Sequence, residues 1–426
     1  MKKILTCAVL VILFAACQNP KQKQSETTAK NVSEQNLVID DAAKERLDAV
    51  LKSFINDSIV AGASALIYED GKEVYFNAVG YADREAQKPM NRNTIATIYS
   101  MTKPIKGTTL MTLYEEGKFK LDDSLASYLP EYGDMQVISK VDASGKRTLE
   151  PLKRPITIAD ITRHTAGFST RADFGLDQTY QEADLRNLNN PLPEMSNRLS
   201  QIPLGFQPGE RWEYGISVDV QAYLVEKISG KPFAQYMKET VLDPLGMTDT
   251  RYFVPKMDRE RVAAIYYKTD SSLTRVSDED VHTVNYDQWA LTPGGWGLTS
   301  TIDDYMKFAQ MLVNGGSYKG STILKPETVK LMATNHLPAV QDSLWLPSKG
   351  QVGFGIDFAV RTEPPHSVEE NNGTVGEFFW DGAASTLFWV DPKNKLTVVL
   401  FVQVFPFQGK VHKMFRDAVY GSYSKS

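Results

Sequence analysis

Residues 63–81 read ASALIYEDGKEVYFNAVGY and contain two strand-like runs separated by Asp70-Gly71. An Asp-Gly pair between such runs predicts a two-residue hairpin turn, because both central residues of that turn need positive φ. Near the other end of the chain, residues 385–390 and 396–404 are strand-like and flank an Asp-Pro-Lys-Asn turn at 391–394. A single sheet assembled from both ends of the chain accounts for the two hairpins, and the middle of the chain is then an insertion.

Helix signals lie next to both hairpins and within the middle of the chain. Asp40-Asp41 can cap a helix whose apolar face is Leu47, Val50, Leu51 and Phe54. A last helix presents Val411, Met414, Phe415, Ala418 and Val419 on one face. In the middle, a capping box at 301–304 begins a helix that ends at 315–316, and a helix at 217–229 ends at Gly230. The predicted fold class is therefore α/β of the α+β type: an antiparallel sheet built from both termini, flanking helices and an inserted, mostly helical region.

The composition is that of an ordinary globular protein. Its 426 residues are 42% hydrophobic and 10% aromatic, and 47 basic against 52 acidic residues give a net charge of −5. A chain this acidic is not typical of a nucleic-acid binder. The only cysteines are Cys7 and Cys17, so no disulfide or thiolate metal site can form beyond residue 17. The five histidines form no His-x-x-x-His pair, and we expect neither a metal nor another cofactor.

The first 36 residues predict a signal peptide followed by a flexible tether. Residues 1–16 combine a basic start with an apolar run too short for the ~20 residues that span a bilayer, which predicts a signal peptide. The run ends at Ala15-Ala16-Cys17, which resembles the bacterial lipobox and implies a lipid on Cys17; a plain secretory signal with a chance cysteine is the alternative. Residues 17–36 are polar and predict a disordered tether before a folded domain at 37–426. We expect a protein of the bacterial cell envelope, a periplasmic or outer-membrane lipoprotein.

Ser100-Met101-Thr102-Lys103 is the candidate for covalent chemistry. Three residues along a helix place the Lys103 amine beside the Ser100 hydroxyl, and an amine there can take the proton that a serine nucleophile must lose. The hydroxyl would lie at a helix start, where unpaired N–H groups favour developing negative charge. The pattern alone is weak, because its spacing recurs at residues 422–425. No Gly-x-Ser-x-Gly elbow is present, so an α/β-hydrolase triad lacks its turn.

Further motifs follow the serine in a definite order. Residues 208–217 read PGERWEYGIS, and residues 376–383 read GEFFWDGA. The other stretches are ITIAD at 156–160, HTAG at 164–167, PLGMTDT at 244–250 and GGWGL at 294–298. Taken together, these motifs resemble the serine β-lactamase and penicillin-recognising superfamily. The resemblance is to its class C-like branch of β-lactamases, DD-peptidases and family VIII carboxylesterases, and it extends from about residue 40 to about residue 420.

The resemblance implies a role for each matching residue. Ser100 would attack a carbonyl and become acylated, and Lys103 would hold or move the proton. Near a lysine ammonium the phenolate form of Tyr214, in the second motif, would be favoured, so either Tyr214 or Lys103 would be the general base. The oxyanion hole would be the backbone N–H groups of Ser100 and of Ala383, which we expect on the strand after the third motif.

Two departures from the family pattern bear on the substrate. The second motif ends at Ile216 where β-lactamases and peptidases have Asn, so the amide that holds a substrate amide is missing. In the third motif Trp380 replaces the Lys or His that would meet a substrate carboxylate, and the negative charge of Asp381 would repel such a group. A Trp-Gly-Gly motif is typical of the family's esterases. We expect Trp212, Trp380, Asp381 and Gly382 at the substrate site.

The expected function is hydrolysis of small carboxylic esters through an acyl-enzyme on Ser100. A DD-peptidase or β-lactamase acting on cell-wall peptides or β-lactams is one alternative. A catalytically idle binding or scaffold protein that keeps the fold is the other. The expected partners are a small-molecule ester or amide and, through Cys17, a membrane; the oligomeric state stays open.

Overall fold

The structure is a computed structural model that describes residues 37–337 and 350–423. The expected signal peptide at 1–16, Cys17 and the tether at 17–36 lie outside these residues, as does part of the repeated serine–lysine spacing at 422–425. The described residues from Leu37 onward form one compact unit. No helix among the described residues is long and apolar enough to cross a membrane.

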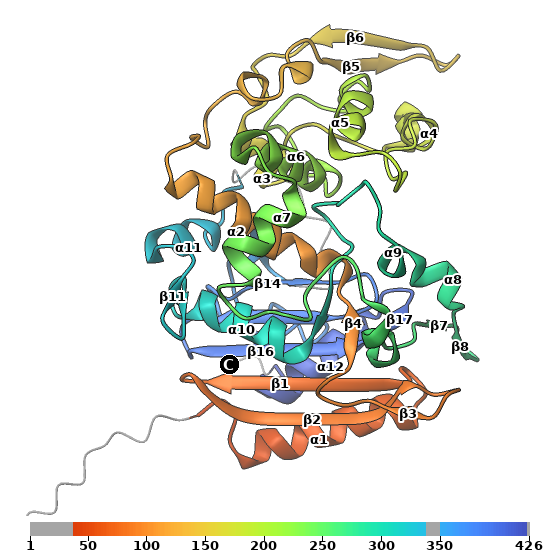
Figure 1. Cartoon of the computed structure of the whole chain (residues 1–426), viewed down its shortest axis with the longest axis vertical. Helices are drawn as coiled ribbons and strands as arrows, with labels where there is room; N and C mark the ends of the chain where they lie inside the picture. The colour runs from red at the N-terminus through yellow and green to blue at the C-terminus, as the bar shows by residue number, and fades with distance from the viewer. Residues whose placement is uncertain (1–36, 338–349, 424–426) are drawn as a thin grey trace, which may run out of the picture. The chain divides into compact units, whose positions relative to one another are not determined.

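An antiparallel sheet forms the centre of the folded unit (Figure 1). Within the described residues it has eight strands in the order β12-β13-β14-β15-β16-β1-β2-β3. Their bounds are β1 (Gly62–Glu69), β2 (Lys72–Asp83), β3 (Lys88–Pro89), β12 (Val352–Phe354), β13 (Ala359–Arg361), β14 (Phe378–Asp381), β15 (Leu387–Asp391) and β16 (Leu396–Val402). Strand β1 pairs with β16 from Ala63–Val402 to Glu69–Leu396, which confirms a sheet built from both ends of the chain.

The turn between β1 and β2 has the predicted conformation. Asp70 and Gly71 have φ of 49° and 73°, the positive values that the hairpin requires. Two helix caps also follow the sequence: Asp40 at the start of the first helix accepts a hydrogen bond from the Ala43 N–H at 2.7 Å, and Gly230 ends its helix with φ of 70°.

Helices cover both faces of the sheet. Helices α1 (Asp41–Asn56) and α12 (Gly409–Tyr420) pack against each other, and α10 (Ile302–Val313) packs against β1, β15 and β16. Two neighbouring side chains on β15 show which helix covers each face of the sheet, because successive side chains along a strand point to opposite faces. The ring of Phe388 lies 4.8 Å from that of Tyr305 on α10, whereas the ring of Trp389 lies 6.0 Å from that of Phe415 on α12.

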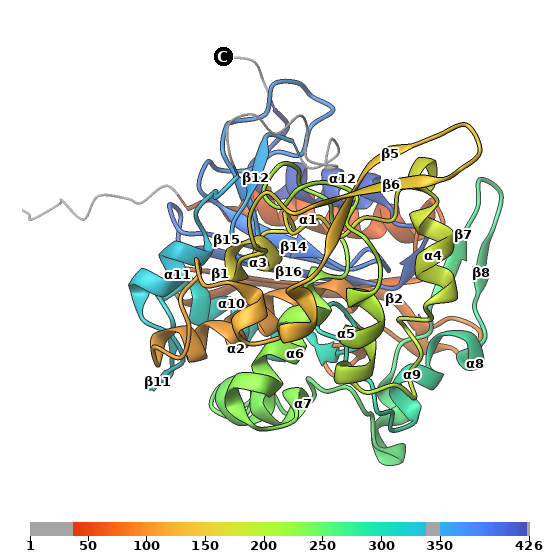
Figure 2. The ribbon, with the colours of Figure 1, turned by 90° about the horizontal axis from the view of Figure 1, so that it is seen from above.

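The insertion lies on the α10 side of the sheet (Figure 1). Its helices are α2 (Thr102–Glu115), α3 (Ile158–Thr162), α4 (Leu176–Glu182), α5 (Leu192–Ser200), α6 (Ser217–Ser229) and α7 (Phe233–Met237). Helix α6 contacts α2, α3, α5 and α7, and therefore organises this layer. The β5–β6 hairpin (Gln136–Val141 and Arg147–Pro151) projects from it (Figure 2).

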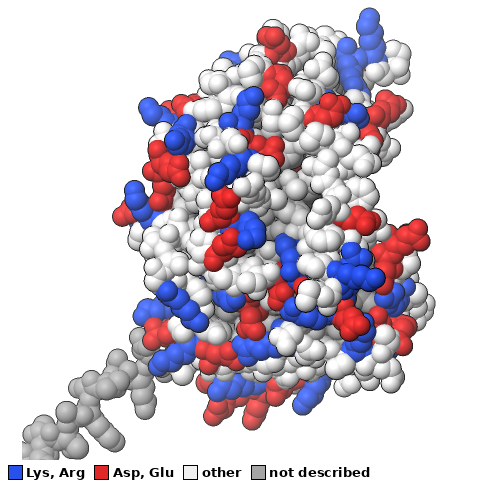
Figure 3. All heavy atoms as spheres, viewed as in Figure 1, with Lys and Arg blue, Asp and Glu red and all other residues white. Residues whose placement is uncertain are grey.

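The remaining elements are short and lie in loops around the sheet. They are β4 (Ile95–Thr97), β7 (Tyr266–Lys268), β8 (Leu273–Arg275), α8 (Asp278–Val281), α9 (Thr283–Tyr286), β9 (Thr299–Thr301), β10 (Ser317–Tyr318), β11 (Ser321–Thr322), α11 (Pro326–Met332) and β17 (Val404–Phe405). Charged side chains of both signs are interspersed over the face drawn in Figure 3.

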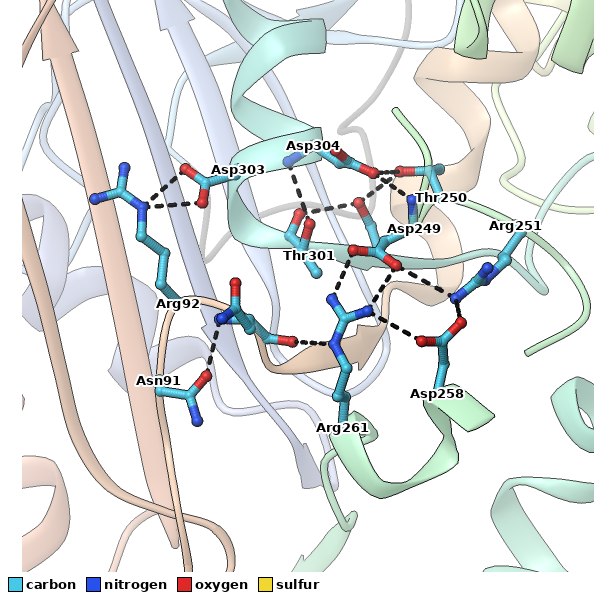
Figure 4. Close-up of polar contacts among 12 residues, drawn as sticks. Asn91, Arg92, Asp249, Thr250, Arg251, Asp258, Arg261, Thr301, Asp303 and Asp304 are labelled. Carbon is cyan, nitrogen blue, oxygen red and sulfur yellow. Dashed lines mark hydrogen bonds and ion pairs between the residues drawn. The ribbon is translucent and has the colours of Figure 1, made fainter. Parts of the chain in front are cut away.

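A polar network fixes the loop between α7 and β9 to the start of α10 (Figure 4). The ion pairs Asp249–Arg261 and Arg251–Asp258 each close at 2.6 Å, and the Asp249 N–H donates to the Asp304 carboxylate at 2.7 Å. The backbone of Arg251 also pairs with that of Thr299 on β9. The network thereby anchors the chain just after residues 294–298, which reach the candidate site.

Candidate active site

Ser100 and Lys103 lie side by side at the start of α2. Ser100 belongs to a short 3₁₀ turn (Tyr99–Met101) that leads directly into the helix, and Lys103 follows in its first turn. The Lys103 ammonium nitrogen donates to the Ser100 hydroxyl oxygen at 3.0 Å and to the Gly295 carbonyl at 2.7 Å. The arrangement directs the lysine at the hydroxyl that would lose its proton.

Burial makes Lys103 a candidate base. The pKa of Lys103 falls to about 7, chiefly because burial disfavours the charged amine; the carboxylates of Asp219 and Asp357 act in the opposite direction. Near neutral pH a large share of Lys103 is therefore a neutral amine with a free lone pair. Such a group can accept the Ser100 proton, and its pKa is matched to that task.

Tyr214 lies over Lys103, whose nitrogen is 4.6 Å from the centre of the phenol ring. Burial raises the pKa of Tyr214 well above its ordinary value, while hydrogen bonding with Ser100 and Trp380 opposes the rise. The expected phenolate is therefore disfavoured, because burial removes the water that would stabilise its negative charge. Tyr214 is held as a neutral phenol, which can donate a proton.

Aromatic side chains surround Tyr214. Its ring centre lies 5.3 Å from that of Trp380 and 6.2 Å from that of Trp212. His164 is 4.9 Å away, and its Nδ1 accepts the Gly215 N–H at 3.3 Å, which holds the second motif in place. Ile216 lies next to Tyr214 at the start of α6 and offers no polar group toward the site.

The third motif lies on β14, with alternate residues on opposite faces. Trp380 is 3% exposed and faces the insertion, where its ring centre is 5.3 Å from that of Tyr214. Asp381 points the other way, with its carboxylate 3.8 Å from Nδ1 of His412 on α12. The strand therefore turns the Asp381 side chain away from Trp380, to the face of β14 opposite the expected substrate site.

The predicted oxyanion donors lie where β14 ends. Ala383 is exposed in the turn between β14 and β15 rather than on a strand, which corrects its expected position. A Cβ added to Gly382 would lie 2.5 Å from the Ile98 carbonyl, so only glycine lets this turn approach the segment that precedes Ser100. Within residues 37–337 and 350–423, neither the Ser100 nor the Ala383 N–H has a hydrogen-bond acceptor in the protein.

Several site residues were not assigned from the sequence. Gly295 accepts from Lys103, and its N–H donates to the Asp219 carboxylate at 3.2 Å. Beneath them, the fully buried Lys106 and Asp357 form an ion pair of 2.7 Å. The sequence motif at 294–298 indicated the loop, but only the tertiary structure shows that the Gly295 carbonyl faces Lys103.

Comparison with known proteins identifies the family. The family model described as Beta-lactamase matches residues 47–420. The chain belongs to the beta-lactamase family. It is 32% identical over 363 residues to Protein Rv1367c of Mycobacterium tuberculosis, covering 84% of this chain and 89% of that protein.

Other relatives of this beta-lactamase-family chain carry named activities. Esterase EstB of Burkholderia gladioli is 28% identical over 397 residues, covering 88% of this chain and 94% of the esterase. The solved structure of EstCE1, a hydrolase with promiscuous acyltransferase activity, superposes with a TM-score of 0.73 at 25% identity. That match covers 89% of this chain and 99% of the other. The chain is accordingly a beta-lactamase-family serine hydrolase.

Proposed function

We propose that this protein hydrolyses small carboxylic esters through an acyl-enzyme on Ser100. The observation that carries the proposal is Trp380, which lies against Tyr214 where a carboxylate-binding cation would stand in a β-lactamase or peptidase. The site is lined by aromatic rings, which suit a neutral acyl group better than a charged one. The relatives named as esterases support the same substrate class.

We assign each step of the proposed reaction to a residue of this site. Neutral Lys103 takes the proton as the Ser100 oxygen attacks the ester carbonyl, and the N–H groups of Ser100 and Ala383 hold the resulting oxyanion. The C–O bond to the alcohol then breaks. Tyr214 donates its phenol proton to the departing alkoxide, and the proton that Lys103 took returns to the phenolate, which restores both groups. Water repeats the sequence on the acyl-enzyme and releases the acid.

A substrate panel tests the proposal. We expect the purified protein to release the alcohol from short-chain p-nitrophenyl esters, and to form an acyl or fluorophosphonate adduct at Ser100 detectable by intact mass. Ser100→Ala should abolish both signals, while Ser422→Ala serves as a matched control in the repeated spacing. Faster hydrolysis of a chromogenic cephalosporin than of any ester would reverse the assignment in favour of a β-lactamase.

We also propose that a lipid on Cys17 holds the protein at a membrane of the bacterial envelope. The support is the sequence at residues 1–17, with its basic start, apolar run and Ala-Ala-Cys end. Labelled palmitate should enter the wild-type protein, and Cys17→Ser should lose the label and move to the soluble fraction. Incorporation that survives Cys17→Ser would contradict the proposal.

A further inference from the structure

Asp381 differs from the glycine of the esterase motif, and its side chain lies on the face of β14 turned away from Ser100. We propose that Asp381 and His412 form a positioning pair that fixes the turn carrying Ala383, and with it one donor of the oxyanion hole. The proposal rests on the proposed function, because it assigns these residues to the acylation step at Ser100.

One imidazole contacts both ends of the turn. His412 projects from α12, is 2% exposed, and its Nε2 lies 2.9 Å from the Ser385 carbonyl oxygen. A carbonyl can only accept, so Nε2 carries the proton in this contact. On the other side of the ring, Nδ1 lies 3.8 Å from the carboxylate of Asp381. With Nε2 donating to Ser385, the ring attracts the Asp381 carboxylate only when Nδ1 is protonated as well, so the pair acts as an imidazolium–carboxylate ion pair across Gly382–Ala384.

Ser385 shows why the turn needs such support. Its φ is 69°, a left-handed conformation that is unfavourable for a residue with a Cβ. A residue keeps such a conformation only where several surrounding contacts hold it, and such residues are common at active sites. The Ser385 N–H donates to the Gly382 carbonyl at 2.8 Å, and its hydroxyl donates to the Val404 carbonyl at 3.2 Å. The bond from His412 adds an anchor on a separate helix.

The opposite side of the turn lies against the nucleophile segment. Gly382 packs so closely on the Ile98 carbonyl that no Cβ fits. The turn is therefore held between α12 and the residues that lead into Ser100. Any displacement away from α12 moves the Ala383 N–H relative to the Ser100 N–H. Oxyanion donors act only when they are in place, and losing one lowers kcat by about 100- to 1,000-fold.

The test compares two substitutions at His412. His412→Leu removes both contacts, whereas His412→Gln keeps an amide that can donate to the Ser385 carbonyl. We expect His412→Leu to lower kcat for a p-nitrophenyl ester by about 30- to 100-fold with little change in KM, since a displaced donor should cost less than the 100- to 1,000-fold loss that follows its removal. The rate of fluorophosphonate labelling at Ser100 should fall in parallel, and His412→Gln should recover part of both.

A buried histidine away from the site provides the matched control. His282 is 1% exposed between α8 and α9 and stacks on Tyr286. His282→Leu should lower the unfolding temperature while leaving kcat near the wild-type value. An equal loss of kcat in His282→Leu would mean that general destabilisation explains the His412 result, and would overturn the proposal.

A double-mutant cycle tests the pairing itself. Asp381→Asn and His412→Gln should each lower kcat, and the double variant should lose less than the product of the two, because the residues act on one turn. If His412→Leu does not fold, kcat and the labelling rate of Asp381→Asn test the same positioning role. If the two losses of kcat multiply in the double variant, or if folded variants keep wild-type kcat and labelling rates, the positioning role is refuted. The proposed function would be unaffected by either result. A wild-type protein that neither turns over esters nor labels at Ser100 would instead refute the proposed function, and this inference with it.

Discussion

Ester turnover should rise with pH through about 7 and level off above it, because burial lowers the pKa of Lys103 to that value. Only the neutral amine can accept the Ser100 proton, so activity follows the deprotonated fraction. This fraction is about one half at the pKa, roughly one tenth one pH unit below it and roughly one hundredth two units below it. The limiting slope of log kcat/KM against pH on the acid side should therefore be close to one.

The assay should follow acid release from an alkyl ester in a pH-stat, because nitrophenol itself ionises near neutral pH. Tyr214→Phe is the informative control. It should lower the rate but keep the midpoint, since the Tyr214 phenol stays protonated across this range. A midpoint at alkaline pH that disappears in Tyr214→Phe would refute the assignment of the base to Lys103 and give it to the phenolate of Tyr214. A flat profile through neutral pH would refute both.

The charges around Lys103 should move the same midpoint in opposite directions. Asp219 raises the pKa of Lys103, so Asp219→Asn should shift the rise in activity to lower pH; Arg186 lowers that pKa, so Arg186→Gln should shift it to higher pH. Shifts of the same sign would contradict the electrostatic account. Separately, Lys106→Met leaves the carboxylate of Asp357 buried without its partner and should lower the unfolding free energy by about 3–5 kcal/mol in urea titrations. Adding Asp357→Asn should recover much of this loss, since Asn tolerates the positive φ at that position.

Features that depend on neighbouring residues could be predicted from the sequence. The turn at Asp70-Gly71 follows from the backbone conformations that glycine and aspartate accept. The contact between Ser100 and Lys103 follows from helical spacing in the same way. In both cases a few adjacent residues contain all the information that the geometry needs.

Features that depend on tertiary burial could not be predicted from the sequence. Asp381 seemed to face a substrate because the motif was placed before a strand instead of on one, and a single step along a strand reverses the side-chain direction. The direction in which the pKa of Tyr214 moves could not be predicted for a related reason. The nearby lysine is visible in the motif spacing, but part of the burial of Tyr214 comes from His164 and Trp380, which are far from it in the sequence.

Strand β1 cannot pair with β16 until nearly the whole chain has been synthesised. Arg46 on α1 donates to the Ala418 carbonyl on α12, 372 positions later, at 3.1 Å. Closing a loop of that length costs on the order of 5 kcal/mol of chain entropy, and proteins rich in such distant contacts fold slowly. The apolar faces of α1 and β1 must therefore be kept from aggregating while the C-terminal strands are still missing. A product that ends before β16 would contain Ser100, Lys103 and Tyr214 yet lack the sheet against which they are assembled.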